Sequence, residues 1–219
     1  MPCAAIIVAS GLSRRMGFDK LAAPIKDIPV LRRTVNTFME APGIDKVIVV
    51  CPQERFDTLL FGDFPKPLIR VDGGKERRHS VEAGLAVLDE SDMMVAIHDG
   101  ARPLVTVEMI QQTIEQARQC GAAALARPVT ETIKKADHEN FSLQGIDRTS
   151  LWYTETPQTF RTSTLKRAYA GLDEKGVLAT DEVSVVESMG ITTKLIHSKG
   201  PNLKITHPSD IQLAEALLS

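Results

Sequence analysis

The chain has 219 residues, 43% of them hydrophobic and 25% charged, which is typical of a globular protein and fits a single domain spanning residues 1–219. Its 26 basic and 28 acidic residues give a net charge of -2, so the basic surplus of a nucleic-acid binder is missing. No apolar run approaches the ~20 residues that a membrane helix needs, and no basic flank of a secretory signal precedes the first apolar run. We therefore expect a cytoplasmic protein that binds neither nucleic acid nor a membrane.

The predicted elements alternate between buried strands and helices. Apolar runs without polar alternation predict strands that are covered on both faces, at Ala4–Ala9, Lys46–Cys51, Leu68–Val71, Met93–His98 and Ala122–Ala126. Helical patterns separate them at Val30–Glu40, Glu76–Leu88 and Val107–Cys120. This order predicts an α/β fold with a mostly parallel, twisted sheet flanked by helices. Ligands of such sheets bind at the carboxyl ends of the strands.

The second half of the chain begins with a different pattern. Residues 129–156 carry a polar centre between apolar segments, which predicts a protruding β-hairpin arm rather than a crossover helix. The remaining predicted elements are helices near Ser163–Leu172 and Asp181–Met189, a strand near Thr193–His197, a short strand at Asn202–Thr206 and a helix near Ser209–Leu218. Thr106 is expected to cap the helix that starts at Val107, and Gly121 to end it.

The three cysteines indicate no special chemistry. Cys3, Cys51 and Cys120 are far apart and form no CxxC pair, which argues against a disulfide framework and a zinc site. We expect all three to be small buried hydrophobic residues.

The loop after the first strand combines small and basic residues. Ala9, Ser10 and Gly11 allow close approach of the backbone to a ligand, and Arg14, Arg15 and Lys20 follow. Backbone N–H groups and cations together suit a triphosphate, on which charge builds during substitution at phosphorus. Neither the P-loop pattern nor the dinucleotide fingerprint is present. From this loop alone, a solvated surface loop is an equally good explanation.

Polar residues also follow two other predicted strands. Gly73 and Gly74 could approach a flat base, with Ser80 hydrogen-bonding to it, although a glycine turn before a helix explains them more simply. Asp99 ends the central strand, where a carboxylate suits Mg²⁺ or substrate hydroxyls. Arg102 has an alternative explanation as the ion-pair partner of Asp99. We expect His98 to be structural.

Two later candidates have ordinary structural explanations of their own. Thr180 followed by two acidic residues matches a helix cap. A lone lysine such as Lys204 is usually solvated. The chain shows no Ser-His-Asp or Cys-His arrangement, which is compatible with a phosphate nucleophile that needs no strong base.

The motifs become specific when they are read in order along the chain: SGLSRRMGFDK, VDGGKERRHSV, HDGARP, PVTETIK, DRTSLWYTETPQTF, ATDEVSVVESMG and NLKITHPSDIQLAEALL. This set resembles the 2-C-methyl-D-erythritol 4-phosphate cytidylyltransferase family of the non-mevalonate isoprenoid pathway, over nearly the whole chain. The resemblance implies a Rossmann-like nucleotidyltransferase fold, Mg²⁺ and a homodimer. It also implies transfer of a cytidylyl group from CTP to 2-C-methyl-D-erythritol 4-phosphate, with release of pyrophosphate.

The resemblance assigns roles to individual residues. It implies that the transition state at the α-phosphate is stabilised by Arg15 and Lys20. The nucleotide would be contacted by Ala9, Ser10 and Gly11, and its cytosine surrounded by Gly74, Lys75 and Ser80. Mg²⁺ and the acceptor phosphate would lie near Asp99 and Arg102, with Asp99 as the possible metal ligand. On the arm that crosses to the dimer partner lie Thr132 and Arg148. The other substrate contacts would be Thr156, Thr180 and Lys204, of which Lys204, together with Arg148, would position the acceptor.

Three alternatives stay open at this level. The acceptor could be ribitol 5-phosphate or a related sugar-alcohol phosphate. The nucleotide could differ, because Val8, Ser13, Lys75 and the short spacing from Arg15 to Lys20 depart from the family pattern, and the first loop is similar to that of molybdenum-cofactor nucleotidyltransferases. The protein could also bind nucleotide without catalysis, although the retained basic residues argue against this.

Overall fold

A central sheet organises the computed structural model, which describes residues 1–11, 17–89, 91–172 and 180–218. The sheet has seven strands in the order β11-β7-β10-β6-β1-β4-β5. Their bounds are β1 Cys3–Val8, β4 Lys46–Val50, β5 Leu68–Val71, β6 Met94–Asp99, β7 Ala122–Pro128, β10 Trp152–Arg161 and β11 Lys194–His197. Pairing is parallel except for β10, which is antiparallel to both β6 and β7. The predicted mostly parallel α/β fold is therefore confirmed.

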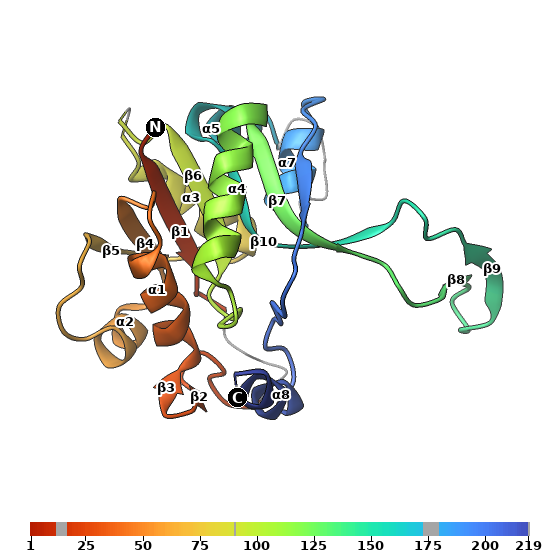
Figure 1. The fold of residues 1–219 in the computed structure, drawn as a ribbon, viewed down its shortest axis with the longest axis horizontal. Coiled ribbons are helices and arrows are strands. Elements are labelled where there is room, and N and C mark those ends of the chain that lie inside the picture. The colour runs from red at the N-terminus through yellow and green to blue at the C-terminus, as the bar shows by residue number, and fades with distance from the viewer. Residues whose placement is uncertain (12–16, 90, 173–179, 219) are drawn as a thin grey trace.

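Helices cover both faces of this sheet (Figure 1). The first layer contains α1 (Val30–Glu40), α2 (Gln53–Leu59), α4 (Val107–Cys120) and α8 (Ser209–Leu217), and the second contains α3 (Arg77–Ala86), α5 (Thr162–Ala170) and α7 (Glu182–Glu187). Successive residues of β1 serve opposite layers: Ile7 packs with the first and Ile6 with the second, and both are fully buried. This two-sided burial explains why the strand sequence shows no polar alternation.

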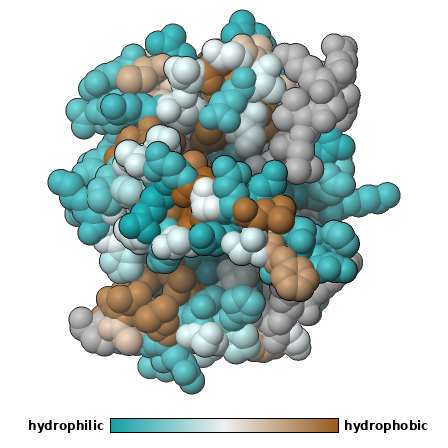
Figure 2. Space-filling view, turned by 90° about the vertical axis from the view of Figure 1, so that its right-hand side faces the viewer, coloured by the Kyte–Doolittle hydropathy of each residue, from teal (hydrophilic) through white to brown (hydrophobic). Residues whose placement is uncertain are grey.

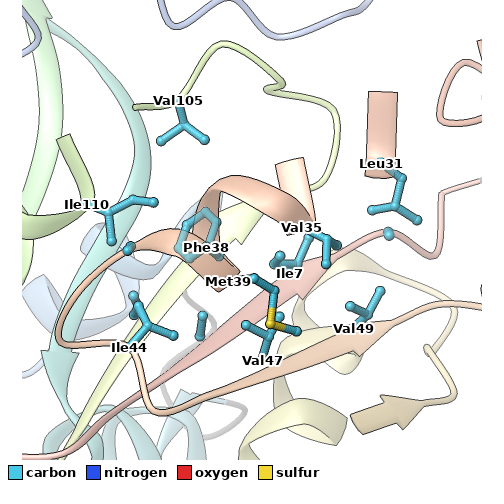
Figure 3. Packing of buried hydrophobic residues seen from close by; sticks show 14 of the residues in the cluster. Ile7, Leu31, Val35, Phe38, Met39, Ile44, Val47, Val49, Val105 and Ile110 are labelled. Carbon is cyan, nitrogen blue, oxygen red and sulfur yellow. The ribbon is translucent and has the colours of Figure 1, made fainter. Parts of the chain in front are cut away.

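The first layer holds a dense apolar core (Figure 3). Phe38 and Val35 of α1 lie against the sheet residues Ile7 and Val47, and Ile110 of α4 reaches the same cluster. All five side chains are fully buried. This packing fixes the first layer rigidly on the sheet, and therefore fixes the loops at the strand ends.

Local signals placed several helix boundaries correctly. α1 and α4 have the predicted bounds. The Thr106 hydroxyl accepts a hydrogen bond from the Met109 N–H at 3.3 Å, and Gly121 ends α4 with a φ of 88°. Such a positive φ favours glycine, which lacks a Cβ.

The predicted arm is present as a long projection from the sheet. Its tip is the two-stranded hairpin of β8 (Ile133–Ala136) and β9 (Ser142–Ile146). Figure 1 shows β7 and β10 leading out to this hairpin, well away from the sheet. The prediction ended the arm at residue 156 and assigned no strand beyond it. In the structure β10 continues to Arg161, and it pairs with both β6 and β7 inside the sheet.

Other expectations need correction. Cys3 and Cys51 are buried as expected, but Cys120 is exposed at the end of α4. Residues 202–206 form no strand: they are an irregular connection, which a 2.8 Å hydrogen bond from the Ile205 N–H to the Ala101 carbonyl oxygen ties to the loop after β6.

Three short elements were not predicted: α2 and the two-residue strands β2 (Pro24–Ile25) and β3 (Ile28–Pro29). Within the described parts of the chain, no helix is long and apolar enough to cross a membrane.

Candidate functional site

The main pocket opens at the carboxyl ends of β1 and β6, with a cavity volume of about 790 Å³. At β1 the chain order reverses, since β1 lies between β4 on one side and β6 on the other. Open α/β sheets bind their ligands at such a reversal, because the loops that follow the two strands diverge there. The lining residues are Val8, Ala9, Ser10, Gly11, Lys20, Leu21, Gly74, Lys75, Glu76, Arg77, Asp99, Ala101 and Lys204.

The described start of the first loop is held by Arg55, a residue of the unpredicted helix α2. Its guanidinium donates hydrogen bonds to the carbonyl oxygens of Ala9 and Gly11, the latter at 3.3 Å, and its Nε lies 2.9 Å from an Asp19 oxygen. These hydrogen bonds hold the backbone of Ala9 and Gly11 against α2. Sequence reasoning missed Arg55, since nothing local distinguishes it from a solvated arginine.

The second wall of the pocket is the glycine loop after β5. Ser80, which is fully buried, links this loop to the first one: its hydroxyl lies 2.8 Å from the Ser10 hydroxyl and accepts a hydrogen bond from the Gly74 N–H at 3.2 Å. A Cβ added at Gly73 would lie 2.4 Å from the Ser10 Cβ. Glycine is therefore required here by close approach, and Ser80 serves as an internal brace rather than lining the pocket.

Asp99 is the electrostatic centre of the site. Its carboxylate lies 2.8 Å from the Lys204 Nζ, 3.3 Å from the Arg77 Nε and 3.6 Å from the Arg102 Nε. Burial would raise the pKa of Asp99, but the three cations outweigh it and hold that pKa well below its ordinary value. Asp99 is therefore an anion that orders basic side chains around the pocket.

His98 and Thr156 form a buried hydrogen-bond chain behind Asp99. The Arg102 carbonyl oxygen can only accept, so the His98 Nε2–H donates to it at 3.3 Å. In the neutral ring, Nδ1 then accepts from the Thr156 hydroxyl at 3.0 Å, and the same hydroxyl oxygen accepts from the Asp99 N–H at 3.1 Å. Burial lowers the pKa of His98 to about 3, so the ring is neutral at pH 7. The expectation that His98 is structural agrees with this geometry.

A lysine from each half of the chain reaches the pocket. Lys20 donates to the Ile205 carbonyl oxygen at 2.7 Å, which ties it to the connection that carries Lys204. Among the described residues, four cationic side chains line the pocket against the two carboxylates of Glu76 and Asp99. This surplus of positive charge suits a polyanionic ligand such as a triphosphate.

A second cavity of about 480 Å³ adjoins the first. Lys204 lines both cavities, and Arg102 lines the second, together with Arg127, Tyr153 and Leu203. The Arg127 guanidinium stacks on the Tyr153 ring at 4.4 Å. Lys204 is therefore placed between two spaces, each of which carries basic side chains.

The structure brings together most of the residues singled out from the sequence. Eight of them line the main pocket: Ala9, Ser10, Gly11, Lys20, Gly74, Lys75, Asp99 and Lys204. From the sequence alone, Lys204 had an ordinary explanation as a solvated lysine. In the structure it is half-buried and contacts Asp99. Arg15, like Arg14 and Ser13, lies outside the described residues.

Other sequence candidates lie outside the pocket lining. Thr156 is 3% exposed, and its hydroxyl is satisfied inside the protein. Thr180 is exposed, but α7 is capped by Asp181, which accepts from the Ser184 N–H at 2.9 Å. Thr132 and Arg148 are exposed on the arm, so only a partner chain or a large movement could bring them to a pocket.

Metal-binding capacity at the site is limited to carboxylates that also face cations. The described residues contain no group of three or more His, Cys, Asp or Glu arranged to hold a metal ion. Mg²⁺ in nucleotide sites is often bound by one or two carboxylates, with phosphate and water oxygens completing its shell. Asp99 would suit that limited role, because it lines the pocket and its carboxyl stays ionised.

Comparisons with known proteins agree on one family. The family model described as 2-C-methyl-D-erythritol 4-phosphate cytidylyltransferase matches residues 3–219. A protein of that name from Caldanaerobacter subterraneus subsp. tengcongensis is 41% identical, over 100% of this chain and 99% of the relative. Another, from Symbiobacterium thermophilum, is 37% identical over 100% of this chain and 93% of the relative.

Solved structures agree with the sequence relatives. The 4-diphosphocytidyl-2C-methyl-D-erythritol synthase of Anaerococcus prevotii has a TM-score of 0.86 at 27% identity, covering 99% of this chain and 98% of its own. The Francisella tularensis cytidylyltransferase has a TM-score of 0.85 at 28% identity, covering 99% and 100%. With a matching family model, sequence relatives and fold, this chain belongs to the 2-C-methyl-D-erythritol 4-phosphate cytidylyltransferase family.

Proposed function

We propose that this protein is a nucleotidyltransferase that joins the cytidylyl group of CTP to 2-C-methyl-D-erythritol 4-phosphate and releases pyrophosphate. Family membership over residues 3–219 supports this reaction. The observation that carries it is Lys204, which borders both the 790 Å³ pocket and the 480 Å³ cavity. Group transfer requires that two reactants be held side by side, and a cation between the two spaces would lie where their phosphates meet.

The chemistry requires positioning and charge neutralisation rather than a strong base. An acceptor phosphate is already an anion at pH 7, so it can attack the α-phosphorus of CTP directly. One P–O bond forms, the bond to the β-phosphate oxygen breaks, and pyrophosphate leaves. We assign Lys204 to the acceptor phosphate, and Lys20 with Arg15 to the charge that develops on the α-phosphate.

The nucleotide would occupy the main pocket between the first loop and the glycine loop. Ala9, Ser10 and Gly11 offer backbone to the phosphates and ribose, and Gly74 with Lys75 borders the base. Ser80 acts indirectly in this proposal, because its hydroxyl holds the Gly74 N–H and the Ser10 hydroxyl together.

We propose that Mg²⁺ arrives with the triphosphate. Asp99 would be its protein ligand, with phosphate and water oxygens supplying the others. The ion would neutralise charge on the phosphates. A chelator added during catalysis should abolish pyrophosphate release, and excess Mg²⁺ should restore it.

We also propose a homodimer with exchanged arms. The arm carries exposed apolar side chains, with Phe141 66%, Leu143 60% and Ile146 36% exposed. A two-stranded hairpin is marginally stable alone, so a surface that covers these side chains would stabilise it. Figure 2, which views the molecule from the side of the arm, shows patches of apolar surface among hydrophilic side chains. Arg148 and Thr132 would then reach the partner's site.

The deciding experiment measures pyrophosphate release from purified protein with CTP, Mg²⁺ and 2-C-methyl-D-erythritol 4-phosphate. Parallel reactions contain ribitol 5-phosphate as acceptor, or GTP as nucleotide. We expect release only with CTP and methylerythritol phosphate. Activity with ribitol 5-phosphate alone would reassign the acceptor, and CTP binding without turnover in any mixture would favour a binding protein.

Arm exchange has its own test. Arg148→Ala and Lys204→Ala should each be inactive as pure homodimers. Randomly mixed chains should regain about a quarter of wild-type activity, because half of the dimers are mixed and one site of each is intact when the arm acts in trans. No recovery after verified mixing would refute the exchange without touching the reaction itself.

A further inference from the structure

A buried carboxylate behind the pocket has no role in the reaction described above. Glu182, the first residue of α7, is 0% exposed. Its Oε2 lies 2.9 Å from the Arg77 Nη2, its Oε1 accepts from the Arg77 Nη1, and the Tyr169 hydroxyl donates to Oε1 at 3.0 Å. A bidentate ion pair of this kind fixes the plane of the guanidinium as well as its position.

The backbone around Glu182 is tied to the central sheet. Gln158 of β10 accepts a hydrogen bond from the Val183 N–H at 3.1 Å and donates one to an Asp181 oxygen at 2.9 Å. Residues on both sides of Glu182 are therefore held by one side chain. The Glu182 carboxylate is therefore held in a fixed position relative to the sheet, and so is the Arg77 guanidinium that pairs with it.

Arg77 connects Glu182 to the main pocket. Two of its nitrogens face Glu182, and its third, Nε, lies 3.3 Å from the Asp99 Oδ1. Arg77 also lines the main pocket. The guanidinium is thus a bridge between a fully buried carboxylate and the carboxylate at the centre of the site.

Asp99 extends the chain to Lys204. Arg77 approaches one carboxylate oxygen, Oδ1, whereas Oδ2 faces the Lys204 Nζ at 2.8 Å and, more distantly, the Arg102 Nε at 3.6 Å. An Arg77 released from Glu182 could turn its two-nitrogen edge to Asp99 and pair with both oxygens. Arg77 would then compete with Lys204 and Arg102 for Oδ2, and the contact that places Lys204 would weaken.

A purely structural role explains Glu182 poorly. Taking a carboxylate out of water is costly, and buried ion pairs can often be replaced by packed apolar residues without loss of stability. The pair here is aimed at a substrate pocket, and it connects residues 105 positions apart. Support of a site residue by a rigid second residue is a recurrent arrangement in enzymes.

We propose that Glu182 is a positioning residue, which holds Arg77 so that Asp99 presents one oxygen to Lys204 and thereby places Lys204 for the acceptor phosphate. This inference rests on the proposed function, since it concerns the acceptor half of that reaction. Glu182 touches no substrate. Its effect falls mainly on acceptor use, because Lys204 is the group that we assign to the acceptor phosphate.

The test is Glu182→Gln, which keeps the size of the side chain and removes its charge. We expect kcat/KM for methylerythritol phosphate to fall at least ~10-fold. The KM for CTP should stay within about threefold, since the Ser80 hydrogen bonds that join the first loop to the glycine loop do not involve Glu182. Glu187→Gln is the matched control, because it makes the same change at an exposed position of the same helix. Its kinetics should equal those of the wild type.

A double-mutant cycle with Arg77→Met separates positioning from folding. When Glu182 acts through Arg77, Glu182→Gln should lower kcat/KM for the acceptor by less than about twofold in the Arg77→Met background. Equal losses for both substrates in Glu182→Gln, or losses that multiply across the cycle, would overturn the inference. An inactive wild type would instead remove the proposed function, so the two failures are distinguishable.

Discussion

Adding one methyl group at Gly73 should disable nucleotide use while leaving the fold in place. In Gly73→Ala the new Cβ would lie 2.4 Å from the Ser10 Cβ and 2.9 Å from the Ser10 Oγ. Carbon atoms in favourable contact are about 3.5–4.0 Å apart. The first loop and the glycine loop must therefore move apart by more than about 1 Å. Ser10 and Gly74 of these loops line the main pocket, so the movement changes the shape of the pocket.

Two magnitudes follow from this displacement. A misplacement of about 1 Å in a site can cost ~10² in rate, so we expect kcat/KM for CTP to fall about 10- to 100-fold. Overpacking of this kind typically costs about 1–3 kcal/mol of unfolding free energy. For a chain of this size each kcal/mol lowers Tm by about 2–4 °C, which leaves the variant folded at 25 °C.

The assay combines steady-state pyrophosphate release with thermal unfolding. Gly84→Ala is one control: its Cβ would lie 2.7 Å from the Ile6 Cγ2, inside the core and outside the pocket lining, so it should lose stability but keep its KM for CTP. Gly171→Ala is the other control, because the nearest atom to its new Cβ would be the Arg167 carbonyl oxygen at 3.9 Å, an ordinary contact distance. A Gly73→Ala enzyme with wild-type kcat/KM for CTP would refute the close-approach argument.

Three further predictions concern other parts of the site. Lys20→Ala and Arg15→Ala should each lower kcat by at least ~10² with a small change in Tm, and wild-type turnover in both would remove the assignment of these cations to the transition state. Arg55→Met should raise the KM for CTP about tenfold, because a charged hydrogen bond of ~1.5–3 kcal/mol to the first loop is lost; an unchanged KM would show that α2 does not hold that loop. His98 stays neutral when folded, since its pKa is lowered to about 3, but takes a proton below about pH 6.5 when unfolded. The free energy of unfolding should therefore fall as the pH drops from 6.5 toward 3, by up to ~1.4 kcal/mol per unit, and urea titrations should find this dependence shallower in His98→Gln; parallel curves for the two proteins would count against the assignment.

The sequence by itself determined the framework of the fold. The apolar runs of β1, β4 and β6 and the amphipathic pattern of α4 depend on neighbouring residues, as do the Thr106 cap and the Gly121 terminus. Such local signals are readable because strand and helix periodicity repeats within a few positions. The rule that ligands bind at strand ends then gave the first loop and Asp99 as site candidates.

The protruding arm was predictable, but the course of β10 was not. A polar centre between apolar segments indicates a hairpin locally. Whether the returning strand stays outside or enters the sheet depends on its partners, and β10 inserts between β6 and β7, whose sequences lie far from it. That insertion also delivers Thr156 to His98.

Only the tertiary structure decided which charges meet. Lys204 and Asp99 are widely separated in the sequence, as are Arg77 and Glu182, yet each pair makes close contact. A lysine in a loop or an acid in the first turn of a helix has the same local pattern whether it is solvated or paired. Ion pairs between distant segments depend on how the helices and loops pack on the sheet. The series of contacts from Glu182 through Arg77 and Asp99 to Lys204 is therefore visible only in the tertiary structure.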